Sequence, residues 1–419
     1  MLKMSAARQF ARLLALSFAF ALPAASHAAI LQAWTQYAAG GVVEARAIVD
    51  DATCPTASLD TKNVAMTERH HPDADFAVRS CATPVPAGTK AITIGTITLH
   101  GPVARPQRIL VLGDTGCRIS KKENQACKDP TAWPYAQLAA RAAAEHPDLV
   151  IHVGDYFYRE APCPADATGC AGVAYGQNWP AWDADVFQPA TPLLQAATWI
   201  AVRGNHEDCQ RGGAGWTAFL GWDPIGAPCT PHEAPLLVDL GGLRVAVLDD
   251  NDSDDKPKEP IATAVAHMHT DAATLLAANP DWLLSHHPTR GVSKLSDKHE
   301  VDGFNATLDA ALHGLAESKL SLRLSGHIHN FQYENYADPA YPPQLVTGMG
   351  GDRLDVNVPE TLGGLKSGDA VIKDGKSVPG FGYIVMERQA DGSWAFDVHD
   401  IQGAVLTKCW VKDHKVGCS

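Results

Sequence analysis

Five polar segments, each placed directly after a short apolar run, contain side chains of the types that bind metal ions. They read Gly113-Asp114-Thr115-Gly116, Gly154-Asp155-Tyr156-Phe157-Tyr158, Gly204-Asn205-His206-Glu207, Ser285-His286-His287-Pro288 and Gly326-His327-Ile328-His329. Carboxylates, imidazoles and an amide oxygen together suit divalent or trivalent first-row metals, whereas calcium avoids imidazole. With Tyr158 counted, these groups are too many for one tetrahedral ion and fit two ions that share a carboxylate. Such a pair of ions activates water and braces phosphoryl oxygens, so the pattern predicts hydrolysis of phosphate esters.

Asp114, Asp155 and Asn205 could each simply cap a helix or a turn, as Asp and Asn often do after strands. Histidines at matching positions favour the metal-ligand interpretation. The apolar runs before the five segments are expected to be buried strands, at 109–112, 149–153, 199–202, 282–284 and 320–324. Because ligands gather at the carboxyl ends of strands in open α/β sheets, residues far apart in the sequence are expected to meet there.

The rest of the chain indicates how that core is built. Further strands are expected at 243–248 and 344–347, and helical spacing occurs at 134–146 and 263–278. This alternation predicts an α/β core with both sheet faces covered. The segments 156–182, 251–260 and 350–379 are expected to be long loops, and 383–387, 394–399 and 409–411 a closing antiparallel meander.

The ordered set GD-x-G, GD-x-x-Y, GNH-E, H-x-P and GH-x-H resembles the calcineurin-like metallophosphoesterases and, within them, the purple acid phosphatases. The resemblance covers 108–351, since LVTGMGG at 345–351 is similar to the strand and glycine turn that follow GH-x-H in the family. It implies a metallophosphoesterase-type α/β sandwich of two β-sheets flanked by helices. A small N-terminal β appendage is expected before it.

The resemblance also implies two ligand sets that share Asp155 as a bridge. Asp114, Asp155, Tyr158 and His329 would bind one ion, and Asp155, Asn205, His286 and His327 the other. The wider superfamily usually has a His two residues after the first Asp, where this chain has Gly116. A phenolate from Tyr158 would replace that imidazole and favour Fe(III), with divalent Fe, Zn or Mn at the second position. The alternative for Tyr158 is packing beside Tyr156 and Phe157.

Residues for proton transfer and substrate binding follow from the same resemblance. His206 is the first choice for protonating the leaving group or holding a phosphate oxygen, and His287 and His299 are its rivals. For His299 an exposed surface position is an equal alternative. Arg118 and Arg290 follow motif residues closely enough to clamp a phosphate, and Arg203 is expected to pack beneath the site. The acidic run 249–255 is interpreted as a solvated loop, and His70, His71, His267, His269 and His414 as surface residues.

The expected function is hydrolysis of phosphate monoesters by attack of a metal-bound hydroxide, with the acidic optimum that the purple enzymes imply. One alternative is a phosphodiesterase or nucleotide hydrolase on the same scaffold. Another is a secreted module that uses its metals only to stabilise the fold.

The first 28 residues predict export. Lys3, Arg8 and Arg12 precede the apolar run 13–22 and a small-residue stretch that ends at Ala28, which is typical of a signal peptide. The run is too short to span a bilayer, so no stable membrane anchor is expected. The formal net charge of -13 disfavours nucleic-acid binding by bulk charge and leaves a small phosphorylated substrate as the expected partner. The oligomeric state stays open.

All 10 cysteines lie after the proposed cleavage position, where disulfides are the default. We expect sequential pairing of 54 with 81, 117 with 127, 163 with 170, 209 with 229 and 409 with 418. Cys-x2-Cys spacing for a zinc-thiolate site does not occur. The chain is expected to divide into a signal peptide at 1–28, a small β-rich region at 29–105 and the metallophosphoesterase domain at 106–419.

Overall fold

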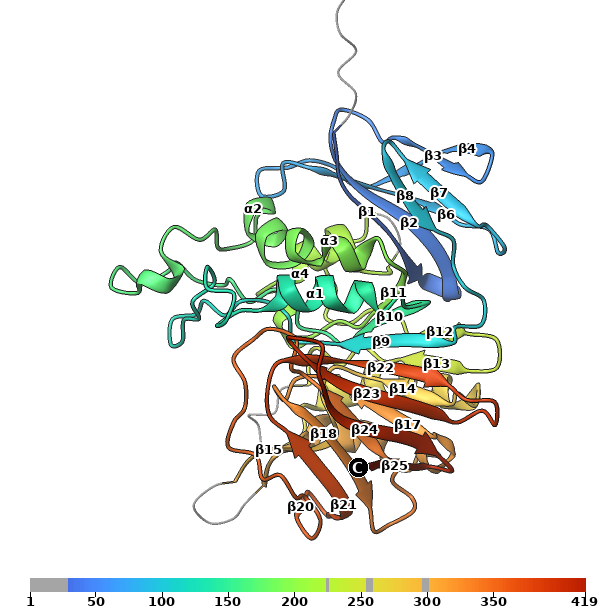
Figure 1. Cartoon of the computed structure of the whole chain (residues 1–419), viewed down its shortest axis with the longest axis vertical. Helices are drawn as coiled ribbons and strands as arrows, with labels where there is room; N and C mark the ends of the chain where they lie inside the picture. Colours follow the sequence, from blue (N-terminus) through green and yellow to red (C-terminus); the bar gives the residue numbers. More distant parts are fainter. Residues whose placement is uncertain (1–28, 224–225, 254–258, 296–300) are drawn as a thin grey trace, which may run out of the picture.

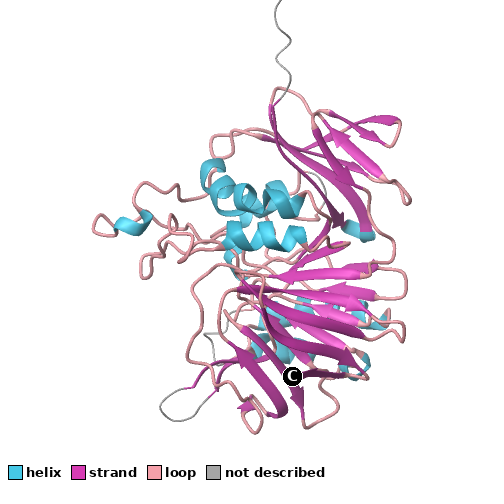
Figure 2. Ribbon diagram, in the orientation of Figure 1, coloured by secondary structure: helices cyan, strands magenta, loops and turns pink. Residues whose placement is uncertain are grey.

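The computed structural model describes residues 29–223, 226–253, 259–295 and 301–419. The proposed signal peptide at 1–28 and His299 lie outside the described residues. In Figure 1 the N-terminal strands, in blue, lie at the top and the C-terminal strands, in red, at the bottom, with strands β9, β10 and β11 between them. Figure 2 shows helices and long loops on one side of the middle of this stack, and further helices behind the lower strands.

The larger sheet contains 11 strands among the described residues, and its centre is parallel. Parallel pairing joins β9 to β10, β10 to β11 and β11 to β1, while β22 pairs antiparallel with the other edge of β9. The order is β25 (Lys415–Cys418), β24 (Val405–Lys412), β23 (Trp394–Asp400), β22 (Gly382–Arg388), β9 (Arg108–Leu112), β10 (Leu149–His152), β11 (Thr198–Ala201), β1 (Ala29–Ala38), β2 (Val42–Asp50), β6 (Arg79–Pro84) and β5 (Thr67–His70).

The second sheet contains eight strands among the described residues and also has a parallel centre. Its parallel part runs from β13 through β14 and β17 to β19. The order is β12 (Leu236–Asp239), β13 (Arg244–Val247), β14 (Trp282–Leu284), β17 (Leu322–Ser325), β19 (Gln344–Thr347), β18 (Phe331–Tyr336), β21 (Ala370–Val378) and β20 (Lys366–Ser367).

Alternation along β13 shows how the layers pack. Val245 and Val247 belong to the main core, which also holds the buried side chains of β9, β10 and β22. Ala246, between them, points to a separate core with α5 (Ala262–Ala277) and α6 (Ala306–Leu312). On α5, Ala264, Met268, Ala272 and Leu275 are buried at helical spacing. The second sheet therefore has the main core on one face and these helices on the other.

Helices α1 (Tyr135–Ala144) and α3 (Gln188–Leu194) pack against each other and on the larger sheet, where α1 contacts β22 and α3 contacts β1. The shorter helices α2 (Trp179–Trp182) and α4 (Gly213–Gly215) lie nearby in Figure 1. The expected sandwich of two sheets flanked by helices is confirmed.

The N-terminal region is rich in β-structure, as expected. Strands β3 (Thr56–Leu59), β4 (Lys62–Ala65), β7 (Ala91–Ile94) and β8 (Ile97–His100) form a separate antiparallel sheet. Strands β1, β2, β5 and β6, in contrast, extend the larger sheet. A domain boundary at 105 stays a prediction, because one continuous sheet crosses from the first region to the second.

Two expected loops contain regular structure. The segment 156–182 includes α2, and 350–379 includes β20 and β21, so the expectation of loops throughout was wrong there. The sequence of β21, AVIKDGKSV, is polar and becomes a strand because it pairs along the edge of β18. Tertiary pairing thus overrides weak local β-propensity. The antiparallel meander β22, β23 and β24 is confirmed.

Five disulfides join the cysteines in the expected sequential order, and no described cysteine is free. Among the described residues, we find no helix with the length and apolarity that a bilayer crossing requires.

Candidate metal centre

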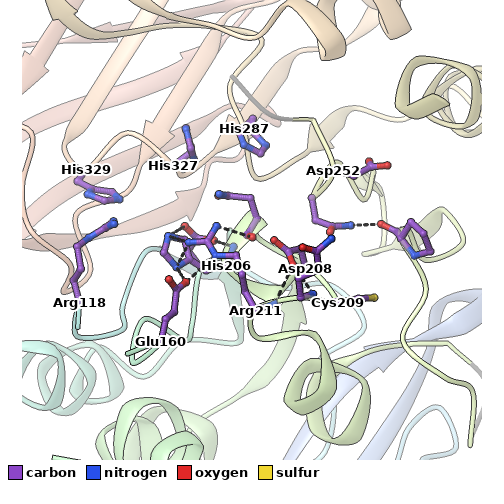
Figure 3. Close-up of a pocket in the computed structure, with 15 residues that line it drawn as sticks. Arg118, Glu160, His206, Asp208, Cys209, Arg211, Asp252, His287, His327 and His329 are labelled. Atoms are coloured by element: carbon purple, nitrogen blue, oxygen red, sulfur yellow. Dashed lines mark hydrogen bonds and ion pairs between the residues drawn. The ribbon is translucent and has the colours of Figure 1, made fainter. Parts of the chain in front are cut away.

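The carboxyl ends of five strands from both sheets meet at one site. Asp114, Asp155 and Asn205 follow β9, β10 and β11 of the larger sheet, and His286 and His327 follow β14 and β17 of the second sheet. A cavity of about 750 Å³ opens above them, lined by Asp155, Asn205, His327 and His329 among others. Figure 3 shows His287, His327 and His329 along one side of this cavity, opposite Arg118, Glu160 and Arg211.

The turns that leave these strands hold a backbone conformation that is rare for residues with a side chain. Asp114 and Asp155 have φ of 57°, and His327 has φ of 68°. This left-handed conformation costs free energy unless the surroundings impose it, and it is concentrated at functional sites. The backbone is closely packed here, since a Cβ atom at Gly204 would lie 2.2 Å from the backbone nitrogen of Asp155.

One group of side chains is centred on the Tyr158 hydroxyl. Its oxygen lies 2.7 Å from Asp155 Oδ2, 3.3 Å from Asp114 Oδ1 and 3.3 Å from His329 Nε2. His329 Nε2 lies 3.3 Å from Asp114 Oδ1 as well. The four residues that the resemblance assigns to the first ion are therefore gathered around one phenolic oxygen.

A second group is centred on His286. Its Nε2 atom lies 3.1 Å from Asn205 Oδ1 and 3.2 Å from Asp155 Oδ2. One ligand atom each from Asp155, His286 and His327 lies within 4.8 Å of the others. Asp155 is common to both groups, which is the position a bridging carboxylate needs.

The histidine orientations fit metal binding. His286 Nδ1 donates to the Val153 carbonyl at 2.8 Å, and His329 Nδ1 donates to the Arg353 carbonyl at 2.7 Å. With Nδ1 held in this way, Nε2 of each ring faces the carboxylates. Metal-ligating histidines are typically oriented by such a hydrogen bond from the other ring nitrogen, so these donors suit a cation.

The site has a strongly negative local potential without its cations. Burial lowers the pKa of His286, but the charges of Asp155, Asp114 and Asp250 and the hydrogen bond to Asp155 together outweigh burial and raise this pKa to about 10. Burial likewise disfavours the charged form of His329. Asp352 and Asp114 favour that form, and the pKa of His329 rises to about 9. Burial and then Asp155 raise the pKa of Tyr158 well above its ordinary value. A phenolate at Tyr158 therefore requires a neighbouring cation.

Buried carboxylates hold the ligand loops in place. Glu207 accepts hydrogen bonds from the backbone nitrogens of Asp155 at 3.1 Å, Tyr156 at 2.9 Å and Phe157 at 2.9 Å. Burial and the charge of Asp155 raise the pKa of Glu207 to about 8. Asp250 accepts from the backbone nitrogens of His286 at 2.8 Å and His287 at 2.9 Å.

Asp250 corrects one expectation from the sequence. Its run, 249–255, was expected to be a solvated loop, yet Asp249 and Asp250 are buried. They directly follow β13 at the same sheet edge as the candidate ligands. Their burial is satisfied by backbone nitrogens and by Arg203, whose Nη1 lies 3.3 Å from Asp249 Oδ2. Arg203 accordingly lies beneath the site as expected.

Three residues that line the cavity form a hydrogen-bonded triad. His206 Nδ1 lies 2.7 Å from Glu160 Oε1, which also accepts from Arg211 Nε at 2.7 Å. Arg211 Nη2 lies 2.6 Å from His206 Nε2. Burial lowers the pKa of His206, although Asp155 and Glu160 act against burial. Figure 3 shows this triad at the centre of the cavity.

The remaining predicted residues have separate positions. Arg118 lines the cavity, donates through Nε to Asp352 at 3.0 Å and lies 4.7 Å over the Tyr158 ring. His287 lines the cavity and is buried, with Nδ1 3.1 Å from Asp250 Oδ2. The structure does not bring Arg290 to the cavity: its guanidinium pairs with Asp309 and covers the Tyr341 ring at 3.8 Å. Strand β15 (Arg290–Leu295) carries it away from the ligands.

Sequence reasoning missed Glu160, Arg211, Asp250 and Asp352. Asp250 had a usable signal, since it follows an expected strand just as the ligands do. Glu160, Arg211 and Asp352 do not directly follow an expected strand as the ligands do. Only the folding of their loops brings them to the site.

Comparison with known proteins places this geometry in a wider context. The model of the calcineurin-like phosphoesterase family matches residues 107–331. Purple acid phosphatase 23 of Arabidopsis thaliana is 23% identical over 318 residues, which are 70% of this chain and 63% of that relative. The chain thus spans less than two thirds of that relative's length.

Two solved structures share the fold. A purple acid phosphatase from yellow lupin seeds matches with a TM-score of 0.57 and 12% identity. The match covers 90% of this chain and 73% of the lupin chain. PhoD matches with a TM-score of 0.57 and 11% identity, covering 92% of this chain and 91% of its own.

Proposed function

Because the chain belongs to the calcineurin-like phosphoesterase family, we propose that it is an exported hydrolase of phosphate monoesters that works with two metal ions. The observation that carries this proposal is the arrangement of the ligand types into two groups that share Asp155. A metal site that only stabilised the fold would have no need of an open cavity of about 750 Å³ above it.

We assign Asp114, Asp155, Tyr158 and His329 to one ion, and Asp155, Asn205, His286 and His327 to the other. When bound, the ions supply an activated water and neutralise charge on the phosphoryl oxygens. The phenolic oxygen of Tyr158 favours Fe(III) in the first group, with divalent Fe, Zn or Mn in the second. Loss of visible tyrosinate-to-iron absorption in Tyr158→Phe, with Tyr175→Phe as the exposed control, would support this assignment.

The chain's own residues bind and orient the substrate. Arg118 and Arg211 line the cavity and offer guanidinium donors to phosphoryl oxygens, a geometry suited to charged oxygen acceptors. His206 is the first choice for protonating the leaving alkoxide. Its Nε2 accepts from Arg211 Nη2, so this role requires the guanidinium to turn toward the phosphoryl oxygens before Nε2 takes up a proton. Glu160 holds His206 through Nδ1 and fixes the ring orientation. His287 is the second candidate for the proton donor.

Two features support export. The segment 1–28 has the layout of a signal peptide, and disulfides form and persist in oxidising compartments. Secretion of the full chain, followed by N-terminal sequencing of the mature protein, tests cleavage after Ala28.

The decisive experiment compares p-nitrophenyl phosphate with bis-p-nitrophenyl phosphate and counts bound metals. We expect faster hydrolysis of the monoester by the wild type, and at least about a 100-fold loss in Asn205→Ala together with a lost ion. Asn63→Ala, an exposed amide on β4, is the matched control. Faster hydrolysis of the diester would instead favour the phosphodiesterase alternative. A wild type that binds two metals but cleaves neither ester would favour a binding module.

A further inference from the structure

A second cluster of metal-binding side chains lies outside the candidate metal centre. His267 and Asp271 are on α5, four residues apart and therefore on one face of the helix. His232 reaches the same place from the segment before β12. One ligand atom from each of the three residues lies within 4.8 Å of the other two.

The two imidazoles of this cluster have nitrogens with no other role. Among the described residues, Nδ1 of His232 and Nδ1 of His267 are buried without a hydrogen-bond partner. Leaving a buried polar atom unpaired costs free energy, so two such atoms in one cluster call for a ligand. The rings stack with centroids 3.7 Å apart and an interplanar angle of 6°.

A carboxylate orients one of these rings. His267 Nε2 lies 2.9 Å from Asp252 Oδ2, so this nitrogen is the donor and Nδ1 keeps its lone pair. A histidine held by a carboxylate through one nitrogen and free at the other is the usual arrangement of a metal ligand. Two imidazole nitrogens and a carboxylate are typical ligands of zinc, whereas calcium and magnesium prefer oxygen ligands alone.

We infer that His232, His267 and Asp271 bind a zinc ion at a site separate from the candidate metal centre. Because the rings are stacked, binding requires the His232 ring to turn about its Cβ–Cγ bond, while His267 keeps its hydrogen bond to Asp252. The ion would tie α5 to the segment before β12. It would also brace Asp252, which Figure 3 shows at the rim of the cavity and which is two residues from Asp250. The inference does not depend on the proposed function.

The test counts zinc in the full-length, exported protein after dialysis against Zn²⁺ in phosphate-free buffer. Wild type is expected to hold one more zinc per chain than His267→Ala or Asp271→Asn. His269→Ala is the matched control, because it removes an exposed imidazole from the same helix and should keep the wild-type count. Asp271→Asn preserves side-chain shape, and circular dichroism will establish that each variant is folded.

A second measurement is independent of activity and of the other ions. Added Zn²⁺ should raise the melting temperature of wild type and His269→Ala more than that of Asp271→Asn. Equal zinc counts in wild type, His267→Ala and Asp271→Asn would overturn the inference. Failure of the candidate metal centre would appear instead in Asn205→Ala, which leaves this cluster intact.

Discussion

The floor and the wall of the cavity are built in different ways. We define the floor as the candidate ligands Asp114, Asp155, Tyr158, Asn205, His286, His327 and His329, and the wall as Arg118, Glu160, Arg211 and Asp252. The floor residues follow strands within a few positions and are positioned by sheet hydrogen bonds. Most wall residues belong to loops held by disulfides, since Arg118 adjoins Cys117, Glu160 lies near Cys163 and Arg211 near Cys209.

This difference extends to exposure. The side chains of Asp114 and His286 in the floor are fully buried, whereas those of Arg118 and Arg211 are 22% and 29% exposed. Burial of the floor keeps charge interactions strong and ligand positions constant. The partly exposed side chains of the wall can contact solvent and a bound substrate. Under the proposed function, the floor would hold the two ions and the wall would contact the substrate.

The largest expected effect comes from Asp155, which belongs to both groups of candidate ligands in the floor. Asp155→Asn removes the shared charge, so we expect loss of both ions and at least about a 1,000-fold fall in activity, equivalent to about 4 kcal/mol. Metal analysis and p-nitrophenyl phosphate hydrolysis check this. Asp166→Asn, an exposed position in the loop between Cys163 and Cys170, is the control. Wild-type metal content in Asp155→Asn would remove the distinction between floor and wall.

A wall substitution should reduce activity without releasing ions. Arg211→Ala deletes a charged donor in the cavity, and we expect about a 10- to 100-fold loss in kcat/KM, as for a lost charge-assisted hydrogen bond. Metal content should equal that of wild type. Arg141→Ala on the exposed face of α1 serves as the control. If Arg211→Ala also lost metal, the wall and floor would have to be treated as one unit.

Disulfides sharpen the comparison because one pair borders the cavity and another does not. Removing Cys209–Cys229 or Cys409–Cys418 by double Cys→Ser substitution should lower the free energy of unfolding by about 3 kcal/mol in each case. Only the first, in which Cys209 lines the cavity, should also lower kcat/KM, by roughly tenfold, because it displaces Arg211. Denaturant titration and steady-state kinetics separate the two effects. Equal activity in both double variants would contradict a disulfide-positioned wall.

The smallest effect concerns a buried carboxylate whose pKa is shifted by burial, with no charged group among the causes of the shift. Both oxygens of Glu334 on β18 are buried and, among the described residues, unpaired, and burial raises its pKa well above 4.5. The folded state therefore holds a proton that the unfolded chain releases, and this contribution to stability is complete below pH 4.5 and declines as pH rises towards the folded pKa.

Glu334→Gln imitates the protonated carboxyl at every pH. We expect unchanged unfolding free energy near pH 4 and a gain of at least about 1 kcal/mol at pH 8, with activity unaffected. Glu360→Gln, which is 78% exposed at its side chain, should show no such pH dependence. A loss of stability at pH 8 would mean that Glu334 is paired as an anion, like the floor carboxylates.

Much of the floor could be predicted because its information is local. Asp114, Asn205 and His327 each follow a glycine after an apolar run, and each lies only a few residues after the end of its strand. The disulfides were predictable for a related reason, since their closures span between 7 and 27 residues. Arg290 also lies a few residues after a motif histidine, but it begins strand β15 and its guanidinium pairs with Asp309. The spacing along the sequence does not specify the direction that the chain takes after the motif.

By itself, the sequence determined which residue types end the strands, and hence the metal chemistry and the family. Only the tertiary structure decided which of these strands belongs to which sheet, that Asp250 is buried, that Arg211 faces His206, and that His232 meets His267. The physical reason is that periodicity and turns act over a few residues, whereas loop contacts depend on closures across many residues, whose outcome is set by packing of the whole chain.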